Sequence, residues 1–279
     1  MTGKLDEAKI WKMAGYVYLI LMLAVLSFPA MVGFITSLKI PKEVYTTPPT
    51  WFPHTIRLRN YLDMFEVLDL NQAFINSFIV AGGSAALALA AALPAGYALS
   101  RFDFPGRRAF LFFILASIMF SPVVIIVALF RLMNVYGLMN QYPALILTNA
   151  TFSLPFSIWL STAYMRSIPK ELDEAASLDR ANRWQVLWHV VLPIALPGIA
   201  TVIIFAFIQA WNEFLLANTF MSTNDMKPLS VTLYSFIGYR GIEWQYITGA
   251  IFLATIPAVI LFLLAQRWLI SGLTIGATK

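Results

Sequence analysis

The most informative stretch of the chain reads SIPKELDEAASLDRANRWQVLWHVVLPIALPG, from Ser167 to Gly198. Pro169 stands where a helix can start, and good helix formers follow it in residues 170–176. The residues after Asn182 favour a second short helix that ends before Pro193. Two short helices in succession predict a compact knob suited to docking on another molecule, while a solvated loop is the ordinary alternative.

The first of these helices has one small or apolar face, because four residues recur at the spacing i, i+3, i+4, i+7. These residues are Leu172, Ala175, Ala176 and Asp179. The acidic residues of its other faces are Glu171, Asp173 and Glu174. Alanines allow a partner surface to approach closely, and we expect the acidic side chains to pair with basic groups on that partner.

The composition of the whole chain indicates a membrane protein. Of its 279 residues, 59% are hydrophobic and 12% are charged, whereas soluble domains carry about 25% charged residues. The formal net charge of +5 fits contact with anionic lipid headgroups. The absence of cysteine excludes disulfides and thiol catalysis, and two histidines, His54 and His189, argue against a His-rich metal site.

We predict an all-α integral membrane protein with six transmembrane helices, each about 20 or more mostly apolar residues long. Their ranges are Gly15–Leu38, Ala73–Leu99, Ala109–Phe130, Tyr142–Met165, Ile194–Ala217 and Ile247–Ile270. The first range is longer than the apolar region of a signal peptide, so we interpret it as an uncleaved anchor. The run of small residues in the second predicts close helix packing.

Lysine and arginine are more frequent in the loops on the side of the N-terminus, which predicts that the N- and C-termini are cytoplasmic. This orientation places the basic turn RFDFPGRR (Arg101–Arg108) and the knob, within the loop Arg166–Leu192, in the cytoplasm. The long segments Lys39–Gln72 and Asn218–Tyr246 then lie outside.

The knob resembles the cytoplasmic signature of permease subunits in binding-protein-dependent ABC importers. That signature is Glu-Ala-Ala, three residues, Gly, nine residues, and Ile-x-Leu-Pro. Here Glu174–Ala176 is followed at the same spacing by Arg180 and by Val190–Pro193. Arg180 replaces the glycine that permits the turn between the two helices in the family, so the resemblance leaves the geometry of this turn open.

Other stretches extend the resemblance over nearly the whole chain. They are QAWNEFLLA (Gln209–Ala217), KPLSVTLYSF (Lys227–Phe236) and QRWLISGLTIGATK (Gln266–Lys279), and they look like the smaller permease of the maltose, trehalose and glycerol-phosphate type. The resemblance implies a type I ABC importer permease fold. It also implies a single permease domain over residues 1–279 that contains the coupling loop 166–192.

The resemblance further implies a permease that does no chemistry. Its coupling residues, which rest in a cleft of an ATP-hydrolysing subunit, would be Glu174, Ala175, Ala176, Leu178 and Asp179. The implied partners are a second homologous permease, a dimer of ATP-binding subunits, an extracytoplasmic sugar-binding protein and membrane lipid, with no nucleic acid. No cofactor is expected in this chain, since the partner ATPase binds ATP and Mg²⁺ and this sequence lacks the G-x-x-x-x-G-K-[ST] phosphate loop. The implied location is the cytoplasmic membrane of a prokaryote, and the implied cargo is a disaccharide such as trehalose or maltose.

Glu213 is the one acidic residue within a predicted span, and an ionisable group in a membrane is a functional candidate. A path for sugar is one interpretation, because a ring can stack on a sugar while amide or carboxyl groups bind hydroxyls. A helix-packing or interfacial contact is the equal alternative. The candidates for the path are Gln209, Trp211, Asn212 and Glu213, with Asn76 and Asn149 as weaker ones.

Rival functions predict features that the sequence lacks. A secondary transporter would carry ionisable groups near the bilayer midplane and inverted repeats, and a membrane-embedded enzyme would carry clustered catalytic groups. An importer of glycerol phosphate or another non-sugar solute is the closer alternative. A permease for amino acids or metal ions would share the knob but not the WNEF stretch (Trp211–Phe214) together with the long outer segment.

Overall fold

The computed structural model describes residues 2–239 and 243–275, and every regular element in these ranges is helical. In chain order they are α1 (Thr2–Ser37), α2 (Pro41–Val44), α3 (Asn60–Leu68), α4 (Leu70–Arg101), α5 (Arg107–Ser117), α6 (Pro122–Val135), α7 (Tyr142–Ser167), α8 (Glu171–Leu178), α9 (Arg183–Gln185), η1 (Val186–Val191), α10 (Leu192–Ile194), α11 (Leu196–Trp211), α12 (Leu215–Phe220), η2 (Asn224–Met226), α13 (Leu229–Tyr239) and α14 (Trp244–Ile275). Residues 276–279, the end of the stretch that carries the resemblance, lie outside the described residues. The chain forms two compact units, residues 1–69 with 236–255 and residues 70–235 with 256–279, and each is described by itself.

Four helices within the described residues are long and apolar enough to cross a membrane. They are Trp11–Ser37, Leu70–Arg101, Tyr142–Ser167 and Trp244–Leu264, which agree with the first, second, fourth and sixth predicted spans. Two pairs of shorter helices pass the same test only when each pair is taken together, and the number of spans then reaches six.

The third predicted span, Ala109–Phe130, is not one continuous helix but a pair of helices with a break between them. Helices α5 and α6 meet at 92°. Ser121 between them is extended (φ −70°, ψ 136°), and its hydroxyl accepts a hydrogen bond from the Val123 N–H at 3.4 Å. A residue before proline avoids the helical conformation and serine is a good N-cap, so the Ser121-Pro122 pair ends one helix and starts the next.

The fifth predicted span, Ile194–Ala217, is also not one helix. The chain bends by 85° before α11, at Ala195, where Pro197 has no N–H to continue the hydrogen-bond ladder. The chain leaves the helix again after Trp211, and Phe214 (φ −120°) precedes the separate helix α12. Glu213 therefore lies in a break between helices.

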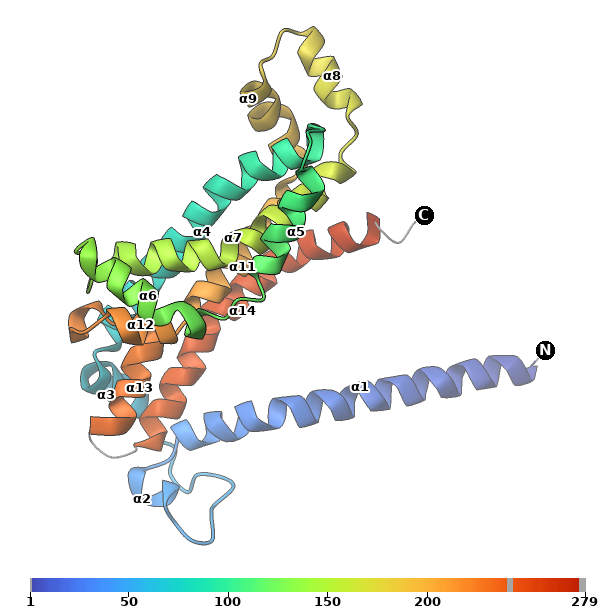
Figure 1. Cartoon of the computed structure of the whole chain (residues 1–279). Coiled ribbons are helices and arrows are strands. Elements are labelled where there is room, and N and C mark those ends of the chain that lie inside the picture. Colours follow the sequence, from blue (N-terminus) through green and yellow to red (C-terminus); the bar gives the residue numbers. More distant parts are fainter. Residues whose placement is uncertain (1, 240–242, 276–279) are drawn as a thin grey trace. The chain divides into compact units, whose positions relative to one another are not determined.

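The second unit is built on α4, which packs along α7, while α11 packs on both (Figure 1). The buried alanines of α4 include Ala81, Ala85, Ala88 and Ala92. A Cβ added at Gly96 would lie 2.7 Å from the Ser161 Cβ and 3.1 Å from the Thr162 backbone nitrogen. Only glycine allows this approach of the two backbones, so the close packing predicted from the small residues is confirmed.

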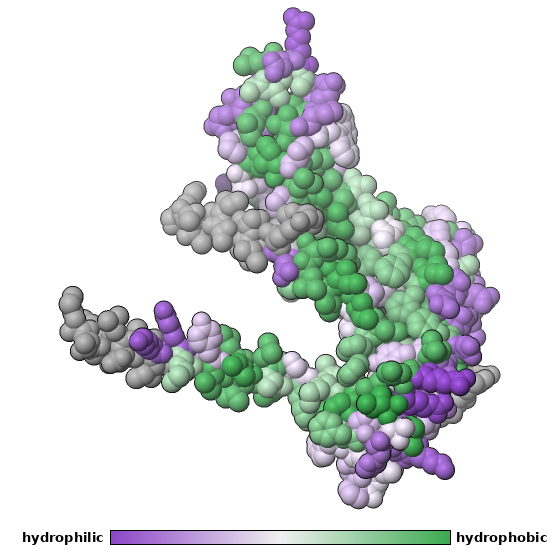
Figure 2. All heavy atoms as spheres, turned by 180° about the vertical axis from the view of Figure 1, so that it is seen from behind, coloured by the Kyte–Doolittle hydropathy of each residue, from purple (hydrophilic) through white to green (hydrophobic). Residues whose placement is uncertain are grey.

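Large apolar side chains cover much of the surface of the long helices. On α1, every residue from Trp11 to Met31 is exposed, although most of them are apolar. In Figure 2, hydrophobic side chains cover much of the long helices, and hydrophilic ones lie among apolar ones at the end of the second unit that carries α8 and α9 and on other parts of the surface. An exposed apolar surface of this extent is the kind that lipid covers in a membrane protein.

Candidate functional site

The predicted knob is present as two short helical stretches beyond the ends of α4 and α7 (Figure 1). We call residues 171–191 the knob. Helix α8 comes first, and the second stretch begins with a capping box at Asn182. The Asn182 side chain accepts the Gln185 N–H at 2.9 Å, and the Gln185 side chain accepts the Asn182 N–H at 2.8 Å. The stretch continues as the π-helix η1 and ends at Val191.

The knob stands on an apolar floor that fixes it to the long helices. The floor joins side chains of α4, α7, η1 and α10, among them Leu93, Met165, Val186 and Leu192. Ala176 of α8 packs against the same floor. Because packed cores transmit displacement, a force on the knob reaches both α4 and α7.

Asp173 is the residue of the knob that the sequence analysis misplaced. It does not face outward with the other acidic side chains, because it is buried and paired within the chain. Its Oδ2 accepts hydrogen bonds from Arg101 Nε and from the Tyr97 hydroxyl, both at 3.0 Å. Arg101 Nη1 also donates to the Ile168 carbonyl at 3.0 Å, so the ion pair ties α8 and the end of α7 to the end of α4.

The outer surface of the knob carries four of the five predicted coupling residues. Glu174, Ala175, Leu178 and Asp179 are exposed, and Leu178 has 86% of its surface accessible. The Glu174 and Asp179 carboxylates form no hydrogen bond or ion pair with the described part of the chain. The knob thus presents an apolar tip flanked by free negative charge.

Arg180 ends α8 in a glycine-like conformation, which settles the geometry that the sequence left open. Its φ is +63°. The Arg180 N–H donates to the Ser177 carbonyl and the Ala181 N–H to the Ala176 carbonyl, each at 3.1 Å. This pair of bonds is the Schellman motif, in which glycine is the usual residue at the left-handed position. The turn of the family signature therefore forms with arginine in the place of glycine.

Asn76, a predicted path residue, holds a loop of the second unit. It is buried on α4, and its Nδ2 donates to the carbonyls of Asp225 at 2.8 Å and Lys227 at 2.9 Å. Its Oδ1 accepts from Gln72 Nε2 at 2.9 Å and from the Tyr142 hydroxyl at 2.7 Å. These four bonds account for its hydrogen-bonding capacity, and a substrate role for Asn76 stays a prediction.

Glu213 caps α12 with both carboxylate oxygens. Oε1 accepts the Leu216 N–H at 2.7 Å, and Oε2 accepts the Ala217 N–H at 3.0 Å. A carboxylate at a helix N-terminus satisfies free amides and interacts favourably with the helix dipole. This contact favours the structural interpretation of Glu213 over the sugar path.

The remaining path candidates differ in exposure. Trp211 is buried in an aromatic group, stacked on Phe207 with the ring centroids 5.6 Å apart and edge-on to Phe78 at 4.9 Å. Asn149 is buried and donates to the Leu145 carbonyl of its own helix at 3.0 Å. Gln209 and Asn212 are exposed, so these two amides are the candidates best placed to meet a ligand. The structure does not bring the six candidates into one cluster of mutual hydrogen bonds within the described residues.

Residues 72–275 match the family described as the inner membrane component of binding-protein-dependent transport systems. The chain belongs to this family. The resemblance drawn from the knob is confirmed, and the chain is a permease of the ABC importer type with several membrane helices.

Individual relatives cover most of the permease. The sulfoquinovosyl glycerol transport system permease protein of Agrobacterium fabrum is 37% identical over 90% of this chain and 88% of the relative. The trehalose transport system permease protein of Mycobacterium tuberculosis is 34% identical over 81% and 84%. A chain of a bacterial ABC transporter that imports the acidic polysaccharide alginate has the same fold, with a TM-score of 0.80, 23% identity and coverage of 93% of this chain and 96% of that one.

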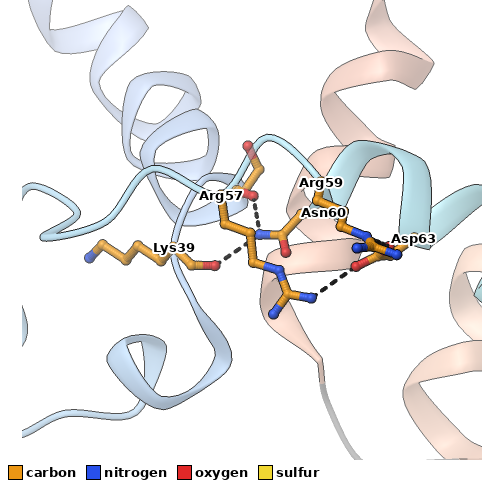
Figure 3. A network of polar contacts seen from close by, with 6 residues as sticks. Lys39, Arg57, Arg59, Asn60 and Asp63 are labelled. Carbon is orange, nitrogen blue, oxygen red and sulfur yellow. Dashed lines mark hydrogen bonds and ion pairs between the residues drawn. The ribbon is translucent and has the colours of Figure 1, made fainter.

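In the first unit, the permease holds its long segment after α1 through a polar network (Figure 3). Asn60 Nδ2 donates to the carbonyls of Ser37 at 2.8 Å and Lys39 at 2.9 Å. Asp63 pairs with Arg57 at 3.0 Å and with Arg59 at 3.3 Å. The segment is therefore an ordered surface, which the sequence analysis identified only as a long loop.

Glu43 orders the same segment of the permease. Its Oε1 accepts the His54 N–H at 2.9 Å and the Thr50 hydroxyl at 3.0 Å. The hydrogen bond from the His54 backbone holds the pKa of Glu43 below its ordinary value, with further support from the Thr50 hydroxyl and the Lys39 charge. Among the described residues, no three His, Cys, Asp or Glu side chains gather as metal ligands. The prediction of no cofactor in this chain stays a prediction.

Proposed function

We propose that this permease moves a sugar across the cytoplasmic membrane of a prokaryote by alternating access, as one part of an importer. The relatives named for trehalose, sulfoquinovosyl glycerol and alginate support carbohydrate as the class of cargo. Within this class, the proposed cargo is a disaccharide such as trehalose or maltose. Glycerol phosphate, or another solute outside the carbohydrates, is the alternative.

The proposed topology has six spans, with each bent helix pair counted as one span and both termini in the cytoplasm. The four long apolar helices and the two bent pairs support this count. The distribution of lysine and arginine supports the orientation. In this topology residues 1–279 act as one permease domain, with residues 166–192 as its cytoplasmic coupling loop.

The observation that carries the proposal is the knob, which is fixed on its inner side and free on its outer side. The proposed contact with an ATPase subunit uses Glu174, Ala175, Leu178 and Asp179 on the outer surface and Ala176 at its edge. The Asp173–Arg101 pair and the apolar floor would transmit a movement of the knob to α4 and α7. Coupling requires only that the knob make contacts of different free energy in the two states of the ATPase.

The proposed partners are those of a binding-protein-dependent transport system, the kind of system that the family description names. They are a second, homologous permease, a dimer of ATP-hydrolysing subunits that bind ATP and Mg²⁺, an extracytoplasmic sugar-binding protein, and lipid. The ordered segment held by Asn60 and Asp63 is the proposed surface of this chain for the binding protein. The proposed sugar path includes Gln209, Trp211 and Asn212, with Glu213, Asn149 and Asn76 supporting it.

Uptake by cells that lack the chromosomal copy and express the importer with this permease tests the proposal. We expect accumulation of one or more labelled disaccharides from a panel that also holds glycerol phosphates. Glu174→Lys should abolish uptake and release the ATPase, whereas Glu66→Lys, the same change at an exposed site on α3, should retain the ATPase. Normal uptake and normal ATPase retention by Glu174→Lys would show that the coupling surface is wrongly assigned.

A further inference from the structure

A cavity of about 670 Å³ lies beside the basic turn between α4 and α5. It is lined by Asp103, Phe104 and residues 106–109 of the turn, by Leu111 of α5 and by Arg166 near the end of α7. Gly106 has a φ of +87°, which lets the chain reverse direction there and start α5. None of these residues belongs to the coupling surface or to the proposed sugar path.

The lining of this cavity carries excess positive charge. Three guanidinium groups, those of Arg107, Arg108 and Arg166, face one carboxylate, that of Asp103. Asp103 pairs with Arg107. Arg107 Nε is buried without a hydrogen-bond partner. Arg108 and Arg166 are exposed and form no ion pair with described residues, so two positive charges stay uncompensated.

The start of α5 lies at the same cavity, where the Arg107 N–H donates to the Phe104 carbonyl at 3.3 Å, and the Arg108 and Ala109 N–H groups have no backbone partner among the described residues. No side chain caps this helix. The first amides of a helix have no partner within it, and the helix dipole makes its N-terminus attractive to anions. Together with the guanidinium groups, they form an environment suited to a phosphate group, which guanidinium binds through two parallel hydrogen bonds.

Apolar surface continues from the cavity along α5. Ala109 and Leu111 line the cavity itself, and Phe112 and Phe113 of the same helix are 68% and 70% exposed. A free anion would use only the polar end of this arrangement. An amphiphile with a phosphate head and acyl chains matches both the arginines and the adjoining apolar face.

We propose that this cavity binds the phosphodiester headgroup of an anionic phospholipid, with its acyl chains along α5. The site would fix the basic turn, and with it Arg101 at the base of the knob, against the membrane surface. The proposal rests on the membrane placement of the proposed function but not on the sugar that is carried.

Native mass spectrometry of the complete importer, released from nanodiscs that contain phosphatidylglycerol and phosphatidylcholine, tests this site. We expect the parent to retain phosphatidylglycerol and the Arg108→Gln/Arg166→Gln variant to bind it about thirtyfold more weakly. The control Lys42→Gln/Arg131→Gln also removes two positive charges from exposed positions elsewhere and should retain the lipid. Equal retention of phosphatidylglycerol by the parent and by the Arg108→Gln/Arg166→Gln variant would overturn the proposal.

Two further measurements complete the test. One distinguishes a lipid phosphate from free phosphate, and the other applies if the double variant does not fold. Millimolar inorganic phosphate should not displace the lipid, and displacement would overturn the lipid assignment. If the double variant fails to assemble, Arg108→Gln and Arg166→Gln alone should each show a smaller loss of lipid, and no loss in either would overturn the proposal. Because lipid retention is measured without transport, failure here leaves the proposed sugar uptake to be judged by its own assay.

Discussion

Arg101 and Asp173 form a buried ion pair, Nε to Oδ2 at 3.0 Å, across 72 positions of the sequence. Only 4% and 7% of the two side chains are exposed. The pair joins the end of α4 to the helix that carries the Glu-Ala-Ala signature. A helix held by such an ion pair can move only together with the helix to which it is tied.

We predict that Asp173→Asn loosens the knob. Removing one partner leaves the Arg101 charge buried and unpaired, which costs about 3 kcal/mol. The expected result is reduced transport for each ATP hydrolysed, with normal insertion in the membrane. The measurement is the ratio of uptake to ATP hydrolysis by the reconstituted importer.

Two further variants separate the ion pair from a general effect of charge. Lys170→Gln removes a charge from the exposed position just before the same helix and should leave the ratio unchanged. Arg101→Met/Asp173→Leu replaces the pair with apolar groups and should recover stability, since buried ion pairs are often no more stable than such replacements. An Asp173→Asn variant with parental coupling would contradict the role of the ion pair.

Arg180→Gly should stabilise the knob. The left-handed conformation at φ +63° costs a non-glycine residue about 1 kcal/mol, and glycine adopts it freely. Arg180→Gln removes the same charge while it keeps the strained backbone, so it is the matched control. The measurement is the rate of proteolysis at the knob. Faster cleavage of the glycine variant than of the glutamine variant would contradict this reading of the turn.

Local patterns were sufficient to predict the knob and the long helices. The helix formers after Pro169 predicted α8, and the residues after Asn182 predicted the second helical stretch. Long apolar runs predicted α1, α4, α7 and α14. All these signals lie within a few turns of the chain, where helical periodicity and caps decide the structure.

The features that the sequence did not yield depend on contacts over long distances. Nothing near Asp173 distinguishes it from Glu171 or Glu174, and only the packing of α4 against the knob selects it as the buried acid. The breaks at Ser121 and Ala195 had a visible signal in the prolines that follow, but proline also lies inside helices here, as at Pro94 and Pro155. Whether a proline kinks a helix or ends it is decided by packing.

Asn76→Ala should release the loop that contains η2. The substitution leaves the carbonyls of Asp225 and Lys227 without their shared donor, at an expected cost of about 2 kcal/mol. Asn149→Ala is the control, because Asn149 bonds only within its own helix. The measurement is thermal unfolding of the purified importer. Equal melting temperatures for the two variants would contradict the role of Asn76 in holding this loop.

The segment after α1 should lose order in acid through Glu43. A folded-state pKa below the ordinary value means that the stability it contributes is full above about pH 4.5 and is lost as pH falls through the lower folded value. Glu43→Gln should remove this dependence and expose the His54 amide at every pH. Hydrogen exchange of that amide between pH 7 and pH 3 is the measurement, with the exposed Glu66→Gln as control. Protection in the Glu43→Gln variant equal to that of the parent would exclude this contact as the cause.

Substitutions at Glu213 can show whether its carboxylate acts as a helix cap or as a contact with sugar. Glu213→Gln keeps the shape but loses the charge and one of the two acceptors for the amides of Leu216 and Ala217, which should cost about 1 kcal/mol of stability. Glu213→Asp retains a carboxylate suited to capping, so uptake should be kept. If the cap is its role, the melting temperature falls in Glu213→Gln and the KM for sugar is unchanged. A raised KM in both variants with an unchanged melting temperature would instead place the carboxylate on the sugar path, because loss of a ligand contact weakens binding without affecting the fold.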